Sequence, residues 1–322
     1  MYTSIVVPLD GSSFGKRSLP VALALAHRSD AAVHLVHVEE PIPHTEAAPR
    51  YDTEPEHDRR ETWRAELTEL ARQLCLETRL RVDAEFLYGP VVPTLERFLS
   101  HGIHDLVVMM THGRGGLKGA WLGGVADGLV RHAPVPLLLV RPGAEWPSDA
   151  IEPLFCHVLV PLDGSTESDA VLDHAVALNT PDATVYTLLA IVVPLPRLGQ
   201  EGTPFDAVAK RAGIEGDNDA AQLHLNAMAK ELRESGALVE TRVVMSRRPA
   251  QGILDTADDE HVDSIVLSTH GLGASSRLVL GSVADEVIRG ARVPVLIFRP
   301  ASARAPTTAA ATAGFPDAKS AY

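Results

Sequence analysis

The sequence predicts an α/β fold made of two copies of one doubly wound domain. Two observations support this prediction: a long segment of the chain is repeated once, and short apolar runs alternate with helical patterns inside each copy. Strands that alternate with helices need right-handed crossovers, which place the strands parallel in one sheet with helices on both faces. We therefore expect two domains, each with a five-stranded parallel sheet.

The repetition is carried by blocks that recur in the same order. Residues 5–12 (IVVPLDGS) return at 158–165 (VLVPLDGS), and residues 105–113 (DLVVMMTHG) return at 263–271 (DSIVLSTHG). The spacing grows from 153 to 158 residues, so the second copy holds a net insertion of five residues in its first half. Smaller matches follow at the longer spacing, at Gly123 and Gly281, Pro136 and Pro294, and Pro142 and Pro300.

The elements of the first copy follow from apolar runs and helical periodicity. Runs typical of buried parallel strands predict strands at residues 4–9, 32–38, 80–88, 105–110 and 136–140. The patterns between them predict helices at 13–28, 57–77, 92–101 and 122–132, and a proline-rich loop spans 39–56. The second copy repeats this order between residues 157 and 298.

Composition marks the domain boundaries. Residues 1–142 and 156–300 form the two domains, and residues 143–155, which include Pro147, form the linker. The tail at 301–322 is rich in Ala, Thr and Pro and has no apolar period, so we expect it to be disordered.

Charge and cysteine content narrow the classes of function. The 322 residues include 29 basic and 42 acidic side chains, and a net charge of −13 repels nucleic acids and anionic membrane surfaces. The apolar runs are far shorter than the ~20 residues that a spanning helix needs. Two cysteines in unrelated contexts exclude a disulfide scaffold and a thiolate zinc site. We expect a cytoplasmic protein without nucleic-acid or membrane partners.

The loop after the fourth strand predicts a phosphate site. In the second copy Ser268 and Gly271 leave this strand, and Gly281 and Ser282 open the next helix. Glycine lets the backbone approach an anion closely, and the N–H groups of a helix start favour negative charge. The Ser282 hydroxyl adds a further donor.

An acidic residue follows the first strand of each copy, at Asp10 and Asp163. Ligands of doubly wound sheets bind beyond the carboxyl ends of the strands, at a topological switch point. If strands one and four are neighbours there, the acid and the glycine loop face one crevice, where the acid suits a ribose hydroxyl or a divalent cation. Two plainer interpretations stay open: the glycines only permit turns, and each Asp caps the following helix.

These blocks resemble the universal stress protein family in its tandem two-domain form. The resemblance covers residues 1–142 and 156–300, and its motifs match in order in both copies. It implies the strand order 3-2-1-4-5 and an ATP site with the pattern Gly, two residues, Gly, nine residues, Gly, then Ser or Thr. Another branch of the family binds no ATP, so either copy could also be one that does not bind nucleotide.

The resemblance implies which residues contact ATP, bound with or without Mg²⁺, with the backbone near Val38 and Ile191 touching adenine. In the second copy they are Pro161, Leu162, Asp163, Ile191, Ser268, Gly271, Leu272, Gly281, Ser282 and Val283. In the first copy they are Pro8, Leu9, Asp10, Val38, Met110, Gly113, Arg114, Gly123, Gly124 and Val125.

The two copies depart from the family pattern to different degrees. The small Ser268 replaces its first glycine in the second copy, whereas the first copy has Met110, which would crowd the phosphates if it pointed into the crevice. Gly124 also lacks the hydroxyl of Ser282. We therefore expect the second copy to bind ATP more tightly.

Other chemistry finds little support in the sequence. His34 and His37 point to opposite faces of a predicted strand and no His-Glu-x-x-His motif occurs, so we expect no metal site. Neither a nucleophile elbow nor a P-loop is present, and we assign no catalytic residue. Trp63, in a helical pattern, is expected in the core.

The last strand of each copy, at 135–140 and 293–298, is apolar and uncharged, and the strand order makes it a sheet edge. An exposed apolar edge invites pairing. We expect the two edges to pair within the chain as a pseudo-dimer, and a homodimer is a further option.

We interpret the chain as an ATP-binding regulator or sensor of stress. Two alternatives stay open: an enzyme that slowly hydrolyses ATP or transfers its phosphate, and an interaction module that needs no nucleotide.

Overall fold

The computed structural model describes residues 1–13, 15–40, 54–111, 122–141, 155–178, 184–194, 205, 208–209, 212–213, 216–269 and 280–300, with the backbone alone at 54–59. The predicted tail and all of the predicted linker except residue 155 lie outside these ranges.

The first half of the chain contains the elements that the sequence predicts for one domain. It begins with β1 (Ser4–Pro8), the short helix η1 (Gly15–Ser18), α1 (Leu19–Ser29) and β2 (Ala32–Glu39). It continues with α2 (Glu54–Thr78), β3 (Val82–Tyr88), α3 (Val91–Leu99), β4 (Leu106–Met110), α4 (Gly124–His132) and β5 (Leu137–Val140).

The second half repeats this order. It contains β6 (His157–Pro161), α5 (Thr166–Asp169), α6 (Leu172–Ala177), β7 (Val185–Val192) and α8 (Asp217–Glu234). It ends with β8 (Leu238–Met245), α9 (Pro249–Asp259), β9 (Ser264–Ser268), α10 (Ser282–Gly290) and β10 (Val295–Phe298).

Three helices differ from the sequence prediction at their starts. The helix expected at 13–28 is divided into η1 and α1, because Pro20 lacks an N–H group and fits only in a first helical turn. The helix expected at 122–132 begins at Gly124, since Gly123 is extended and precedes the first turn. Helix α2 begins at Glu54, inside the predicted loop.

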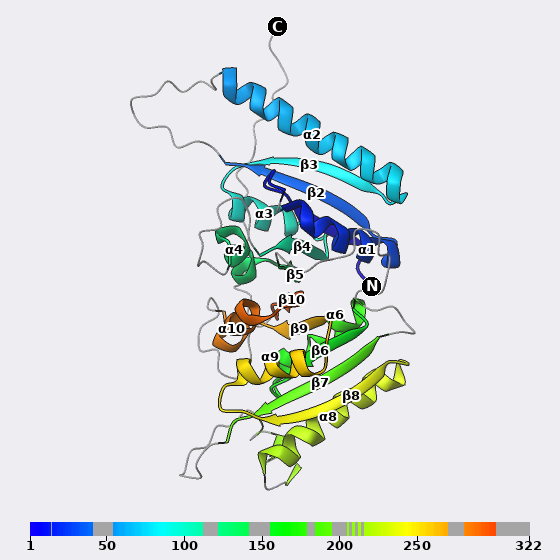
Figure 1. Ribbon diagram of the computed structural model, residues 1–322, viewed down its shortest axis with the longest axis vertical. Coiled ribbons are helices and arrows are strands. Elements are labelled where there is room, and N and C mark those ends of the chain that lie inside the picture. The colour runs from blue at the N-terminus through cyan, green and yellow to red at the C-terminus, as the bar shows by residue number, and fades with distance from the viewer. Residues whose placement is uncertain are drawn as a thin grey trace, which may run out of the picture.

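The strands join into one ten-stranded sheet in the order β3-β2-β1-β4-β5-β10-β9-β6-β7-β8 (Figure 1). Each half has the strand order 3-2-1-4-5 with parallel neighbours, as predicted. The two halves meet at β5 and β10, which run antiparallel with Leu138 opposite Leu296. This pairing confirms that each apolar edge is covered by the other.

Alternating strand residues build one apolar layer on each face of the sheet. Leu106, Val108 and Met110 of β4 join the layer that contains α1, α2, α6 and α8. Val107 and Met109 join the layer that contains α3, α4, α9 and α10. Both layers run through the two halves without a break, so the seam between β5 and β10 lies inside the core.

Arginine side chains cross the seam on the face of α4 and α10. Arg141, after β5, donates to the carbonyl oxygen of Ala291 at the end of α10, and Arg299, after β10, donates to the carbonyl oxygen of Arg131 in α4. A cation at a helix C-terminus offsets the partial negative charge there. The two contacts mirror each other, so the halves are related by an approximate two-fold axis.

A further arginine crosses the seam on the opposite face. The Nη2 of Arg28 donates to the carbonyl oxygen of Leu178 at 2.9 Å, and its guanidinium lies 5.3 Å from the centre of the Phe155 ring. Nearby, Asp263 accepts hydrogen bonds from the backbone N–H groups of Cys156 and His157, and burial raises the pKa of this carboxyl.

The insertion in the second copy lies between β7 and α8. The strands keep the spacing of 153 residues up to β7, whereas Leu67 and Leu74 of α2 correspond to Leu225 and Leu232 of α8 at a spacing of 158. Phe205, in this connection, is 1% exposed and lies against His224 of α8. The second half thus gains an aromatic anchor under α8.

One buried histidine makes the stability of the first half sensitive to acid. His104 is 4% exposed, bonds Ser4 Oγ through Nδ1 at 2.9 Å, and packs between Phe98 and His34. Burial lowers the pKa of His104, as do His34 and His101, while Asp105 raises it. The folded chain therefore takes up a proton at His104 less readily than the unfolded chain does.

We predict that the free energy of unfolding falls as the pH drops below about 6.5, the ordinary pKa of histidine, by at most about 1.4 kcal/mol per pH unit for this one group. The fall stops below the lowered pKa, where both states are protonated. His104→Val, which introduces the residue found at Val262 in the second half, should flatten this dependence in urea unfolding between pH 7.5 and 5. His27→Ala, at an exposed position that is not among the groups acting on His104, is the control, and equal slopes for His104→Val and the parent would contradict the prediction.

Candidate functional site

In each half an acidic turn follows the first strand, at the carboxyl end of a strand that pairs with the fourth strand of the same half. Asp10 follows β1, and β1 pairs directly with β4. In the second half Asp163 follows β6, which pairs with β9 in the same way. The chain leaves β1 toward β2 on one side, while β4 lies on the other side, so this edge is the topological switch point of each half.

Each acid closes a tight turn with one carboxylate oxygen. The Oδ1 of Asp10 accepts hydrogen bonds from the Ser12 backbone N–H at 2.9 Å and from Ser12 Oγ at 2.6 Å. Asp163 accepts from Ser165 in the same manner, at 3.1 Å and 2.6 Å. Each acid thus orders the turn before the helical segment, whereas the cap of α5 that the sequence assigned to Asp163 as an alternative is supplied by Ser165.

A helix starts beside each acidic turn. The backbone N–H of Gly123 donates to the carbonyl oxygen of Thr111 at 2.8 Å, and Gly281 donates to Thr269 at 3.0 Å. These bonds hold the first turns of α4 and α10 against the ends of β4 and β9. A Cβ on Gly281 would lie 2.9 Å from the Thr269 carbonyl oxygen, so the approach requires glycine, whereas a Cβ on Gly124 would meet nothing within 4 Å.

The remaining predicted site residues divide between the two faces of the sheet. Val38 and Ile191, near the ends of β2 and β7, are half-buried on the face that carries α4 and α10. The same holds for Val125 and Val283 in the first turns of these helices.

The side chains of Leu9 and Leu162 are buried in the opposite layer, which leaves their backbone as the part that faces the switch point. Pro8 and Pro161 are the last residues of β1 and β6. Gly113, Arg114, Gly271 and Leu272, which belong to the predicted phosphate loops, lie outside the described residues.

Met110 does not crowd the switch point as the sequence analysis considered. It is 5% exposed and packs with Leu106 and Val108 in the layer of α1 and α2, on the face opposite α4. The alternation of the strand fixes this direction, because positions 106, 108 and 110 share one face. Ser268, its counterpart in β9, is half-buried.

The histidines of β2 separate as the sequence predicts. His34 packs edge-on against His104, whereas His37 stacks on Trp63 at the other face, with ring centres 5.7 Å apart. Among the residues that the structure describes, no group of histidine, cysteine and acidic side chains is arranged to hold a metal ion.

Trp63 has a role that the sequence analysis missed. It is half-buried, and its indole lies directly over Gly11 in the Asp10 turn as well as on His37. The expected core position therefore describes only part of its contacts. Its place in the first half of α2 was the available signal, because α2 begins at the edge of the sheet where the strands have their carboxyl ends.

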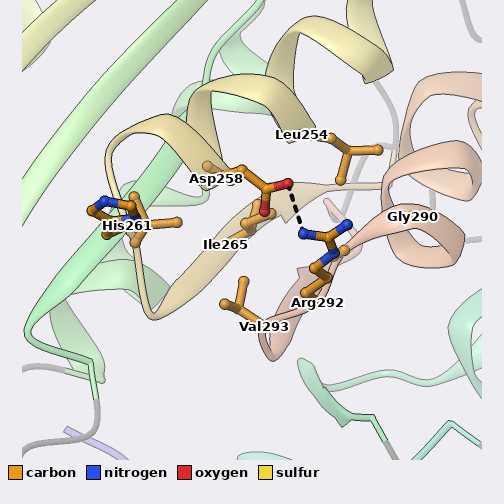
Figure 2. Close-up of a pocket in the computed structure, with 10 residues that line it drawn as sticks. Leu254, Asp258, His261, Ile265, Gly290, Arg292 and Val293 are labelled. Carbon is orange, nitrogen blue, oxygen red and sulfur yellow. Dashed lines mark ion pairs between the residues drawn. The ribbon is translucent and has the colours of Figure 1, made fainter. Parts of the chain in front are cut away.

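A cavity of about 270 Å³ lies at the opposite edge of the sheet from the acidic turns, between α9, α10 and the amino ends of β9 and β10 (Figure 2). Gly290, one of its lining residues, stands where the first half has His132, which pairs with Glu96 at 3.6 Å. In Figure 2 the guanidinium of Arg292 reaches the Asp258 carboxylate across the rim, at 3.3 Å. This cavity is separate from both acidic turns.

Within the described ranges, no helix has the length and apolar character needed to cross a membrane.

Two pseudo-symmetric halves, each with an acidic turn and a glycine-started helix at its switch point, define a tandem doubly wound α/β protein. The family model described as "Universal stress protein family" matches residues 1–141 and again residues 155–299. The chain belongs to this family.

Similar proteins cover from two thirds to nearly all of the chain. A universal stress protein of Mycobacterium tuberculosis H37Rv is 30% identical over 233 residues, which cover 69% of this chain and 70% of the relative. Another from the same strain is 28% identical over 320 residues, 92% and 94% of the two chains. The crystal structure of a universal stress protein from Archaeoglobus fulgidus shares the fold, with a TM-score of 0.65, 18% identity and coverage of 92% and 96%.

Exchanging the first residues of α4 and α10, Gly124 and Ser282, should reverse the order of nucleotide affinity that we expect for the two switch-point sites. Gly124→Ser adds a hydroxyl where a Cβ meets open space, and Ser282→Gly removes one. Since a hydrogen bond to a charged group contributes roughly 1.5–3 kcal/mol, we predict that Gly124→Ser strengthens Mg-ATP binding in the first half by about tenfold or more. Ser282→Gly should weaken the second half by a similar factor in calorimetric titrations.

Gly124→Ala and Ser282→Ala are the matched controls, because they supply the Cβ without the hydroxyl. Equal affinities for Gly124→Ser and Gly124→Ala would show that the hydroxyl contributes nothing.

Proposed function

We propose that the chain binds ATP, with or without Mg²⁺, at the switch point of each half and acts as a nucleotide-responsive regulator. The observation that carries this proposal is the meeting of an acidic turn and a glycine-started helix at the carboxyl ends of two paired strands, in both halves. The helix start supplies N–H groups for phosphate, and the acidic turn supplies a carboxylate suited to a ribose hydroxyl.

The charges at the helix starts support phosphate binding. Asp127 and Asp285 lie in the first turns of α4 and α10, where a free carboxylate would repel a phosphate. Arg131 holds Asp127 through two hydrogen bonds of 3.0 Å, and Arg289 holds Asp285 at 2.8 and 2.9 Å. These bonds raise the pKa of both arginines, and each guanidinium beside its carboxylate offsets the negative charge in the first turn.

The glycine at Gly281 supports the same proposal. Its contact with the Thr269 carbonyl brings the start of α10 to the end of β9 without an intervening side chain. The backbone N–H groups of the first turn then lie beside the Asp163 turn on the neighbouring strand. An anion bound there would face the backbone N–H groups of the first turn of α10, with no bulky side chain at position 281 in between.

Mg-ATP should raise the melting temperature of the full chain. A ligand that binds only the folded state stabilises it by about 2.7 kcal/mol at a concentration of 100 Kd. The measurement is thermal unfolding at increasing Mg-ATP concentration, with Mg²⁺ alone as the control. An unchanged melting temperature at millimolar Mg-ATP would favour an interaction module that needs no nucleotide.

Phosphate release under the same conditions separates binding from hydrolysis. A regulator that holds intact ATP gives a melting shift without release, whereas sustained release in proportion to protein concentration would make the chain an ATP hydrolase.

A further inference from the structure

The Asp10 turn is held from behind by an aromatic side chain. Gly11, the next residue, has a left-handed φ of +77°, and a Cβ built on it would lie 2.0 Å from Cη2 of Trp63 and 2.4 Å from Cζ2. Such distances leave no room for any side chain at position 11. The indole of Trp63 therefore lies flat against the backbone of the turn.

A second ring fixes the other side of Asp10. His37 stacks on Trp63 with an angle of 10° between the ring planes, and its Nδ1 donates to the carbonyl oxygen of Leu9 at 2.8 Å. The backbone N–H of Leu9 donates in turn to Val36 of β2 at 2.8 Å. The residues before and after Asp10 are thus tied to β2 and α2 by one continuous stack.

The stack lies on the opposite face from the helix start. Leu9, Leu67 and Leu70 pack beside Trp63 in the layer of α1 and α2, around a cavity of about 20 Å³, whereas α4 lies in the other layer. A cavity of this size holds one water molecule. Trp63 therefore meets the turn from the side away from the proposed phosphate position and acts through the turn.

Among the described residues, the two positions that correspond to the stack hold small side chains in the second half. The residue at the place of Trp63 is Ala221, and the residue at the place of His37 is Ala190. Ser165 Oγ accepts from the Ser168 backbone N–H at 3.1 Å, as Ser12 Oγ does from Gly15 in the first half. The second half adds a bond from the Asp163 backbone N–H to Ser168 Oγ at 3.3 Å, which Gly15 cannot make in the first half.

We propose that Trp63 positions Asp10 for nucleotide in the first half, so that this site depends on α2 and the site in the second half does not. The inference rests on the proposed function. Trp63 is a positioning residue, because it holds the backbone on which the Asp10 carboxylate stands. An ordered turn binds more tightly than a loose one, since less conformational entropy is lost on binding.

The test compares the two sites one at a time in the full chain. Gly281→Val is chosen to block the second site, because its Cβ would meet the Thr269 carbonyl oxygen. Gly123→Val is the matched substitution at the first site, where Gly123 donates to the Thr111 carbonyl oxygen as Gly281 does to Thr269. Calorimetric titration with Mg-ATP then measures the site that is left. We expect Trp63→Ala to weaken binding roughly tenfold in the Gly281→Val background and to change nothing in the Gly123→Val background.

Two further variants separate positioning from general loss of stability. Trp63→Phe keeps an aromatic ring on His37 and should recover most of the affinity of the first site. Leu74→Ala removes a buried side chain on the same face of α2, away from the Asp10 turn, and should lower the melting temperature while leaving both affinities unchanged.

The outcomes distinguish this inference from the proposed function. If the parent binds no Mg-ATP in the first half, the proposed function fails there and the inference with it. If the parent binds, an unchanged affinity for Trp63→Ala, or an equal loss for Leu74→Ala, overturns the positioning role alone.

Discussion

The antiparallel pairing of β5 with β10 is the constraint on which the architecture depends. Both strands are apolar and buried except at Phe298, so neither half could leave its own edge in water without exposing a row of leucine, isoleucine and valine side chains. Pairing them makes one sheet of ten strands and merges the apolar layers of the two halves. The reciprocal contacts of Arg141 and Arg299 follow from this antiparallel arrangement, because each arginine leaves its strand toward the helix of the other half.

A second pairing, between β1 and β4, creates the candidate site. These strands are about a hundred residues apart in the chain, and their pairing brings the Asp10 turn beside the start of α4. The second half repeats this with β6 and β9. The frame is the same in both halves, while the side chains around it differ: Ser282 against Gly124, and Ala221 against Trp63. Strand pairing therefore sets where a ligand can bind, and the local residues set how firmly the binding groups are held.

The sequence predicted the fold because it is written twice, so that each weak strand or helix pattern was supported by its copy. It predicted the acidic turns and the start of α10 at Gly281 and Ser282 because these follow directly from local residue types, whereas the starts of α1, α2 and α4 differed. The direction of Met110 was not predicted: its alternation with Leu106 and Val108 was visible, but which helices cover that face is a tertiary fact. The contact of Trp63 was missed for the same reason. A helical pattern shows which side of the helix Trp63 lies on, but not that this side packs on the turn at Gly11. The seam arginines were also missed, because their partners are carbonyl groups roughly 150 residues away.

The pairing of β5 with β10 inside one chain has a consequence for how the assembly behaves on dilution. Two separate chains that shared this edge would part as their concentration fell, whereas a covalent connection keeps the partner edge at a fixed, high effective concentration. In a symmetric dimer every substitution also occurs twice, once in each subunit. Here a change in one half leaves the other untouched: Gly290 lines a cavity in the second half, whereas its counterpart His132 in the first half pairs with Glu96. The joined chain therefore retains the geometry of a dimer at any concentration and lets its two halves specialise independently.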